Sequence, residues 1–203
     1  FKMFTFSRLF GNFDIKSKSG FIIFNNNISL TISSPYDLFC ESFANGIFKK
    51  KINIGENELE VSEVEIINNI IDKGNFIIDT LSPIVVYSTL YKTNGSKYTV
   101  YFQPGEKEFD RLISENLVKK YKAFKGEDYI GEVKIKAIWQ PKQNIIDYKN
   151  FIIKGYSGRF DISGPVELLQ IGVDAGFGSK NSMGFGCVKV VKDKNVKNFT
   201  NGE

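Results

Sequence analysis

The long amphipathic stretch that begins near Pro104 constrains the fold more than any other part of the sequence. Its apolar residues recur with the 3.6-residue period of an α-helix, and they are Phe109, Leu112, Ile113, Leu117, Tyr121 and Phe124. Acidic residues crowd the first turns and lysines the last, which matches the helix dipole at both ends. Gly126 is a suitable stop. The pattern predicts one secure helix whose apolar stripe must be covered by another element.

β-prone runs surround this helix in the second half of the sequence. The predicted strands cover 76–90, 97–102, 133–139, 151–156, 159–162 and 186–191. We interpret 151–156 and 159–162 as the two arms of a hairpin, and we expect a short helix after Pro165. Strand, helix, strand, strand, helix, strand is the order of a ferredoxin-like fold, which is an antiparallel sheet with both helices on one face.

The first half shows only the last four elements of that order. β-prone runs at 20–24 and 28–32 precede a helix that starts after Pro35, and a hairpin follows the helix. We interpret Phe21 and Phe24 as core residues, and we expect an opening strand and helix before Phe1. The sequence therefore predicts an α+β protein with two tandem ferredoxin-like (RRM-like) domains, residues 1–72 and residues 73–203.

The composition is that of an ordinary globular protein, with 42% hydrophobic and 25% charged residues among 203. The sequence shows neither a run long enough to span a bilayer nor a secretory signal, so we expect a cytoplasmic protein without membrane contact. Cys40 and Cys187 are interpreted as reduced core residues. The chain has no histidine, which removes the commonest metal ligand and general base. We expect neither a metal site nor a cofactor.

Charge is distributed unevenly between the two halves. The net charge is +4, but the first 72 residues carry seven basic and nine acidic side chains. The basic excess therefore lies in the second half. An excess of this size is compatible with an anionic partner, and it also serves solubility.

A glycine-rich segment near the carboxyl end, residues 172–186, is the strongest local signal. Its five glycines are expected to expose backbone N–H groups that cradle a phosphate, and neighbouring side chains add donors. The predicted phosphate contacts are Gly176, Gly178, Ser179, Lys180, Asn181, Ser182, Gly184 and Gly186. The segment follows a helix and leads into a strand, the reverse of nucleotide-binding loops, so we expect a longer polyanion. The alternative is a helix stop followed by a tight turn.

Three segments together resemble a known family. The run G-x-G-S-x-N-x-x-G-F-G-x-V at 176–188 resembles the carboxy-terminal signature of the CRISPR-associated repeat endoribonucleases, the Cas-six family. Phe1-Lys-Met-Phe-Thr-Phe-Ser-Arg-Leu9 is similar to the F-K-x-F-T-F-S-x-L strand of that family, and Leu81-Ser-Pro-Ile-Val85 is similar to its L-S-P-I strand. The order and spacing of all three match.

The resemblance implies metal-independent cleavage of CRISPR repeat RNA into guide units. In that chemistry the 2′-hydroxyl upstream of the scissile bond attacks the adjacent phosphate and leaves a 2′,3′-cyclic phosphate. The reaction needs a base, an acid and a cation for the crowded phosphorane. The resemblance places a histidine and a tyrosine upstream of Phe1, and Lys2 matches the family's charge-stabilising lysine. A strand-edge lysine in solvent is the alternative for Lys2.

Other basic residues are further candidates for RNA contact. Arg8 lies in the same strand as Lys2, and Lys16 and Lys18 precede the 20–24 run. Lys134 and Lys136 project from one face of a predicted strand beside Trp139 and are predicted to line a groove with the glycine-rich segment. The alternative for Arg8 is that it covers the sheet, and the alternative for Lys134 and Lys136 is a solvated strand face.

Two functions remain open at this point. The first is the repeat endoribonuclease, and the second is a CRISPR repeat RNA-binding protein that does not cleave. The expected partner in both is CRISPR repeat RNA, with a second copy of the chain or a CRISPR effector complex as open alternatives. A small-molecule phosphate enzyme is disfavoured because of the order of helix, loop and strand.

Overall fold

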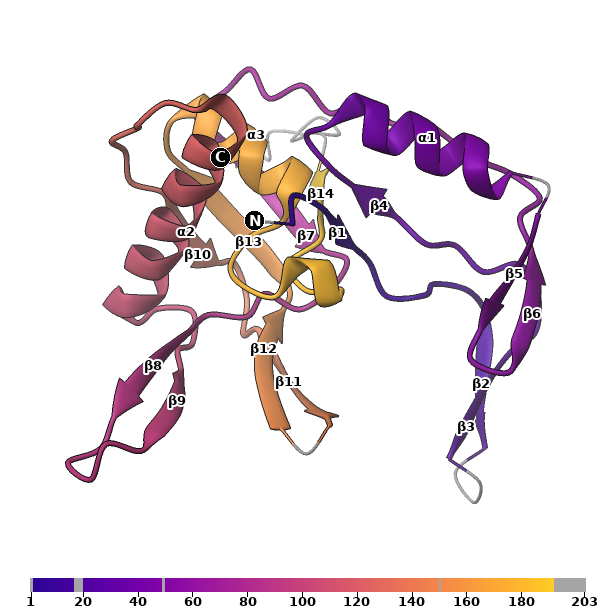
Figure 1. Ribbon diagram of the computed structural model, residues 1–203, viewed down its shortest axis with the longest axis horizontal. Helices are drawn as coiled ribbons and strands as arrows, with labels where there is room; N and C mark the ends of the chain where they lie inside the picture. Colours follow the sequence, from indigo (N-terminus) through magenta and orange to yellow (C-terminus); the bar gives the residue numbers. More distant parts are fainter. Residues whose placement is uncertain (1, 17–19, 49, 150, 192–203) are drawn as a thin grey trace, which may run out of the picture.

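The computed structural model describes residues 2–16, 20–48, 50–149 and 151–191. The second half is built on one four-stranded antiparallel sheet in the order β10-β13-β7-β14 (Figure 1). Its elements in chain order are β7 (Asn75–Thr80), α2 (Lys107–Lys125), β10 (Lys134–Ala137), β13 (Arg159–Ser163), α3 (Val166–Ala175) and β14 (Val188–Val191). This order and this pairing are ferredoxin-like, as predicted for the second half.

Helix α2 forms where the sequence predicts it. Phe109, Ile113 and Leu117 are completely buried in the main core beneath the helix. Gly126 ends the helix with φ 79°, a left-handed conformation that glycine adopts without steric cost. The apolar stripe of α2 and the apolar residues of α3, such as Leu168 and Leu169, lie in the same cluster as the buried side chains of the sheet.

Two β-hairpins are inserted into this domain. One consists of β8 (Tyr87–Tyr91) and β9 (Lys97–Tyr101), and the other of β11 (Lys142–Tyr148) and β12 (Phe151–Ser157). Both project from the same side of the domain (Figure 1). The predicted hairpin of 151–156 with 159–162 is wrong, because β12 pairs with β11 while β13 joins the main sheet. Strand β11 was missed because Lys-Gln-Asn at its start does not alternate in hydrophobicity.

The first half contains small two-stranded sheets and one helix. Its elements are β1 (Thr5–Phe6), β2 (Phe13–Lys16), β3 (Phe21–Phe24), β4 (Ile32–Ser33), α1 (Asp37–Ile47), β5 (Lys51–Ile54) and β6 (Asn57–Glu60). The pairs are β1 with β4, β2 with β3 and β5 with β6. No residue of α1 is buried. The division of the chain at residue 72 stays a prediction.

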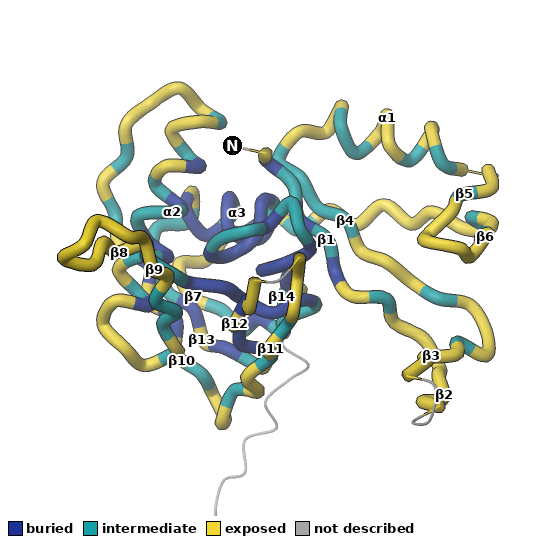
Figure 2. The backbone as a smooth tube through the Cα atoms, turned by 60° about the horizontal axis from the view of Figure 1, so that its bottom comes forward, coloured by how far each residue is buried: buried dark blue, intermediate teal, exposed yellow. Residues whose placement is uncertain are grey.

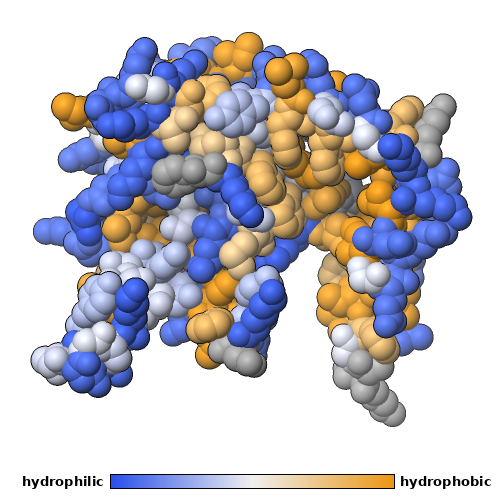
Figure 3. Space-filling model, viewed as in Figure 1, coloured by the Kyte–Doolittle hydropathy of each residue, from blue (hydrophilic) through white to orange (hydrophobic). Residues whose placement is uncertain are grey.

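Burial is concentrated in the second half. In Figure 2 the buried backbone follows the main sheet and α3, whereas most of the first half is exposed. Hydrophobic residues are visible over the first half, including the region of β2 and β3 (Figure 3). The interpretation of Phe21 as a core residue is wrong, since the residue is 66% exposed in the β2–β3 hairpin. Phe24 is half-buried, and its ring contacts that of Phe13.

Candidate nucleic-acid interface

The glycine-rich segment folds into a tight loop between α3 and β14, and the name glycine-rich loop is used below for residues 176–186. Four of its glycines, at 176, 178, 184 and 186, have φ between 71° and 87°. Lys180 shares this left-handed conformation with φ 62°, and a single 3₁₀ turn covers Asn181–Met183. Five positive φ values within eleven residues require residues that tolerate this conformation, which glycine does best.

These glycines are buried, and they allow the chain to pack closely. A Cβ atom at Gly186 would overlap the carbonyl oxygen of Phe177, and one at Gly178 would lie 2.5 Å from that of Val85. At Gly184 it would lie 2.5 Å from the ring of Phe6. Each of these contacts leaves no room for a side chain. The glycines therefore serve the internal packing of the loop.

Several amides of the loop are already engaged within the protein. Phe177 N donates to Gly186 O at 2.9 Å, Ser179 N to Val85 O at 2.8 Å, and Gly186 N to Pro83 O at 2.8 Å. Gly184 N donates to Asn181 O at 2.9 Å. The N–H groups of Gly184 and Gly186 are therefore not bare donors for a phosphate, and we remove these two residues from the candidate contacts. Gly176 and Gly178 are also buried, and their contact with a phosphate stays a prediction.

A buried lysine holds the loop from beneath. Lys120 of α2 is 2% exposed, and its Nζ donates to Gly176 O at 2.6 Å, to Gly178 O at 3.2 Å and to Asn181 Oδ1 at 2.7 Å. Burial lowers the pKa of Lys120 to about 7. The three oxygen acceptors match the three donors of an ammonium group. Lys120 is therefore a functional candidate that sequence reasoning missed.

Asn181 completes this network. Its Nδ2 donates to Phe177 O at 3.2 Å and to Phe185 O at 3.0 Å, while its Oδ1 accepts from Lys120. The side chain is buried, so it holds the two ends of the loop together. The prediction that Asn181 contacts a phosphate is corrected accordingly, since its donors are used internally.

The accessible donors of the loop are Ser179, Lys180 and Ser182, all of which are half-buried. The Nζ atom of Lys180 lies 4.9 Å from the ring centroid of Tyr87, a cation–π distance. These three side chains are the polar groups that the loop can offer to a ligand from outside.

The amino-terminal segment packs directly on this loop. Thr5 Oγ1 of β1 donates to Phe185 O at 2.9 Å across 180 residues of sequence. The guanidinium of Arg8 lies 5.2 Å from the ring centroid of Phe185. Lys2 is exposed three residues before Thr5, and it shares one side of this extended segment with Arg8 because side chains alternate. The structure thus brings two of the three motif segments together.

The third motif segment lies against the same loop. Gly186 N donates to Pro83 O, and Cys187 N donates to Ser82 Oγ at 3.0 Å. Val85 accepts from Ser179, as described above. The three segments that carried the resemblance are therefore neighbours in space, although more than 70 residues lie between each segment and the next.

The remaining basic candidates lie elsewhere. Lys134 and Lys136 are exposed on β10, the sheet edge opposite β14, so that β13 and β7 separate them from the strand that follows the loop. The predicted groove shared with the loop is therefore wrong. Lys16 ends β2 in a projecting hairpin (Figure 1), and Lys18 lies outside the described residues.

The described part of the chain lacks both a metal-binding cluster and a membrane-spanning helix. Over these residues no group of three or more histidine, cysteine, aspartate or glutamate side chains is placed to hold a metal ion. Over the same residues no helix combines the length and apolarity needed to cross a membrane.

Known proteins are similar to this chain in sequence and in fold. Residues 60–190 match the family described as "CRISPR associated protein Cas6, C-terminal". The chain is 35% identical over 201 residues to CRISPR-associated endoribonuclease Cas6 1 of Methanocaldococcus jannaschii, and the match covers 98% of this chain and 77% of that protein.

Solved structures agree with this match. One described as CRISPR associated protein Cas6 is 32% identical and has a TM-score of 0.80. The match covers 95% of this chain and 80% of the chain in that structure. Another, described as a Cas6-related gene from Pyrococcus furiosus, is 26% identical with a TM-score of 0.84 and coverages of 95% and 79%. These likenesses confirm the tandem ferredoxin-like fold. By sequence and by fold, the chain belongs to the Cas6 family of CRISPR-associated proteins.

Proposed function

We propose that this protein is an endoribonuclease that cleaves CRISPR repeat RNA to make guide RNAs. The observation that carries the proposal is the packing of the Lys2–Arg8 segment on the glycine-rich loop, joined by the hydrogen bond from Thr5 to Phe185. In this packing Arg8 lies against Phe185 of the loop that carries Lys180, and Lys2 precedes Thr5 by three residues in the same segment. The relative from Methanocaldococcus jannaschii, which is named an endoribonuclease, supports the activity.

The proposed chemistry uses the RNA's own nucleophile. The 2′-hydroxyl attacks the adjacent phosphate, the P–O5′ bond breaks, and the products carry a 2′,3′-cyclic phosphate and a 5′-hydroxyl. Lys2 is proposed to stabilise the charge that develops on the phosphorane. Arg8, Ser179, Lys180 and Ser182 are proposed to hold the phosphodiester backbone. The mechanism requires no metal ion.

Cleavage of the cognate repeat RNA by the full-length protein in the presence of EDTA tests this proposal. We expect cleavage to persist, the product to carry a cyclic phosphate, and a 2′-deoxy substitution at the scissile position to abolish cleavage while leaving binding intact. Lys2→Ala is expected to slow cleavage roughly hundredfold, whereas Lys107→Ala, an exposed lysine at the start of α2, should have no effect. A requirement for Mg²⁺ or a 3′-hydroxyl product contradicts the mechanism.

The second candidate function is binding of CRISPR repeat RNA without cleavage. The absence of histidine from these 203 residues favours it, because no imidazole is present in them to act as a base. Tight binding of the unmodified repeat without any cleaved product would establish this alternative. A cytoplasmic location, and association with a second copy or with a CRISPR effector complex, stay predictions.

A further inference from the structure

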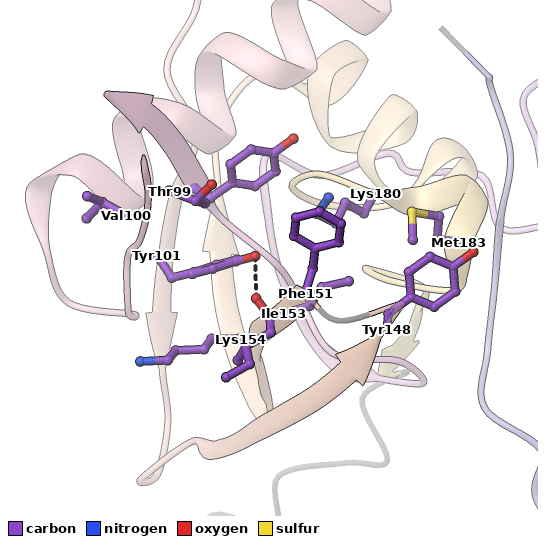
Figure 4. A pocket seen from close by; sticks show the side chains of 11 residues that line it. Thr99, Val100, Tyr101, Tyr148, Phe151, Ile153, Lys154, Lys180 and Met183 are labelled. Atoms are coloured by element: carbon purple, nitrogen blue, oxygen red, sulfur yellow. Dashed lines mark hydrogen bonds between the residues drawn. The ribbon is translucent and has the colours of Figure 1, made fainter. Parts of the chain in front are cut away.

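A cleft opens between the two inserted hairpins and reaches the glycine-rich loop (Figure 4). Its volume is about 730 Å³, within the range of roughly 300–1,000 Å³ of small-ligand sites. Tyr87 and Tyr101 line it from the β8–β9 hairpin, Phe151 and Lys154 from the β11–β12 hairpin, and Lys180 from the loop. We refer to it as the hairpin cleft.

The walls of the hairpin cleft are tied together at their base by residues 84–86. Ile84 exchanges two backbone hydrogen bonds with Tyr156, at 2.9 and 2.8 Å. Val85 O accepts from Ser179 of the loop, and Val86 O accepts from Phe102 at 3.0 Å. Three consecutive residues therefore connect the two hairpins and the loop, so that the cleft is part of the packed domain.

A side-chain hydrogen bond also joins the two hairpins. The hydroxyl of Tyr101 donates to Ile152 O at 2.9 Å, shown as the dashed line in Figure 4. The rings of Tyr87 and Tyr101 lie 5.9 Å apart. The Tyr101 ring is therefore held in place before any ligand arrives, which reduces the entropy lost on binding.

The chemistry of the lining is aromatic and cationic. Phe151, Tyr101 and Lys180 are turned toward the same space (Figure 4), and Phe151 is 72% exposed. Of the described residues that line the hairpin cleft, none is acidic, whereas Lys154 and Lys180 are cationic. Aromatic faces beside ammonium groups suit a planar group linked to a phosphate, because bases stack on aromatic rings and phosphates attract cations.

We propose that the hairpin cleft binds one unpaired nucleotide of an RNA strand whose backbone follows the glycine-rich loop. The base stacks on Phe151, and the phosphate contacts Lys180. The nucleotide is unpaired because a base inside a duplex has no free face to offer to an aromatic ring. This inference rests on the proposed RNA-binding function and adds to it a site for a single base.

The first test is equilibrium binding of the cognate repeat RNA to the full-length protein. We expect Phe151→Ala to weaken binding about tenfold through the loss of one stacking contact. Tyr91→Ala is the matched control, since Tyr91 is 66% exposed on the β8–β9 hairpin but does not line the cleft. Because Phe151 is largely exposed, its replacement should leave the melting temperature unchanged.

The second test locates the nucleotide. Abasic sites are introduced one at a time along the repeat, and each RNA is bound to the unaltered protein and to Phe151→Ala. We expect one abasic position to weaken binding to the unaltered protein about tenfold and to have no further effect in Phe151→Ala, because both changes remove the same contact.

The outcomes separate this proposal from the function on which it rests. An unaltered protein that does not bind repeat RNA contradicts the proposed function and, with it, the nucleotide site. Binding by the unaltered protein with Phe151→Ala no weaker than Tyr91→Ala overturns the nucleotide site alone. Weakening by Phe151→Ala without coupling to any abasic position also overturns it, because the residue then acts without touching a base.

Discussion

At the scale of single residues, Lys120 has the most unusual environment. An ammonium group with almost no exposure to water is tolerated because Gly176, Gly178 and Asn181 supply three oxygen acceptors. Deprotonation would leave one acceptor without a donor, since a neutral amine has only two N–H bonds. The protonation state of Lys120 therefore controls how firmly the loop is held.

We predict that repeat RNA affinity falls as pH rises through about 7, where Lys120 loses its proton. The expected decrease between about pH 6.5 and pH 8.5 is roughly three- to tenfold, the effect of one hydrogen bond. None of these 203 residues is a histidine that would titrate in this range, and Asp174, whose pKa burial raises to about 6, titrates below it. Fluorescence anisotropy at constant ionic strength measures the affinity.

Variants of α2 identify the group responsible. Lys120→Met should bind RNA more weakly and lose the pH dependence, whereas Lys119→Met, at an exposed position one residue away, should retain it. The fall in RNA affinity with rising pH cannot be caused by global unfolding, because the protein becomes more stable over this range. A folded-state pKa below the ordinary 10.5 makes the free energy of unfolding rise as pH increases from about 7. Affinity of the unaltered protein that stays constant across the range contradicts the prediction.

The position of Lys120 in the sequence indicates that it is buried, although its charge suggests an exposed residue. Lys120 follows Leu117 by three residues and precedes Phe124 by four, so it lies on the apolar stripe of α2. The run of lysines at this end of the helix was attributed to the helix dipole, which holds for exposed Lys122 and Lys125. A lysine on the buried stripe predicts an internal acceptor, although only the fold shows that the acceptor is the glycine-rich loop.

At the scale of elements, the glycine-rich loop owes its shape to packing as much as to turn geometry. Gly186 and Gly95 have nearly the same φ, 73° and 79°. A Cβ at Gly186 would overlap the Phe177 carbonyl, whereas nothing lies within 4 Å of one at Gly95. Alanine at Gly95 therefore introduces only backbone strain, whereas alanine at Gly186 introduces the same strain together with steric overlap.

We predict that Gly186→Ala lowers the free energy of unfolding by at least about 3 kcal/mol and weakens RNA binding. Gly95→Ala should cost only about 1 kcal/mol, the strain of a left-handed alanine, and should leave RNA binding unchanged. Urea denaturation measures both changes. Equal costs at the two glycines would show that the loop accommodates a Cβ by moving, and would contradict the packing role.

Local patterns predicted the elements that depend on a few neighbouring residues. The apolar period and Gly126 located α2, and Pro165 located the start of α3. Strand β11 and the burial of the glycines could not be predicted in this way. The start of β11 does not alternate in hydrophobicity, although its partner β12 is the next strand of the same hairpin. The burial of the glycines depends on contacts with β1 and with Val85, which are distant in the sequence.

At the scale of the whole molecule, the basic candidates lie on different parts of the surface. Arg8 and Lys180 lie around the glycine-rich loop, whereas Lys134 and Lys136 lie on the opposite edge of the main sheet. Lys136 is directly opposite Asp161 in the strand register. An anionic strand that follows the loop therefore meets the first group without reaching the second.

The salt dependence of RNA binding tests whether the RNA follows the glycine-rich loop and avoids Lys134 and Lys136. Each phosphate contact on a single strand contributes about 0.7 to the slope of log K against log salt concentration, because counterions are released. We expect Lys180→Ala to weaken binding and reduce the slope by about this amount. Lys134→Ala combined with Lys136→Ala should leave the slope unchanged, as should Lys107→Ala. A smaller slope in the Lys134→Ala, Lys136→Ala double variant would place RNA at the β10 edge of the main sheet. A slope unchanged by Lys180→Ala would remove Lys180 from the interface.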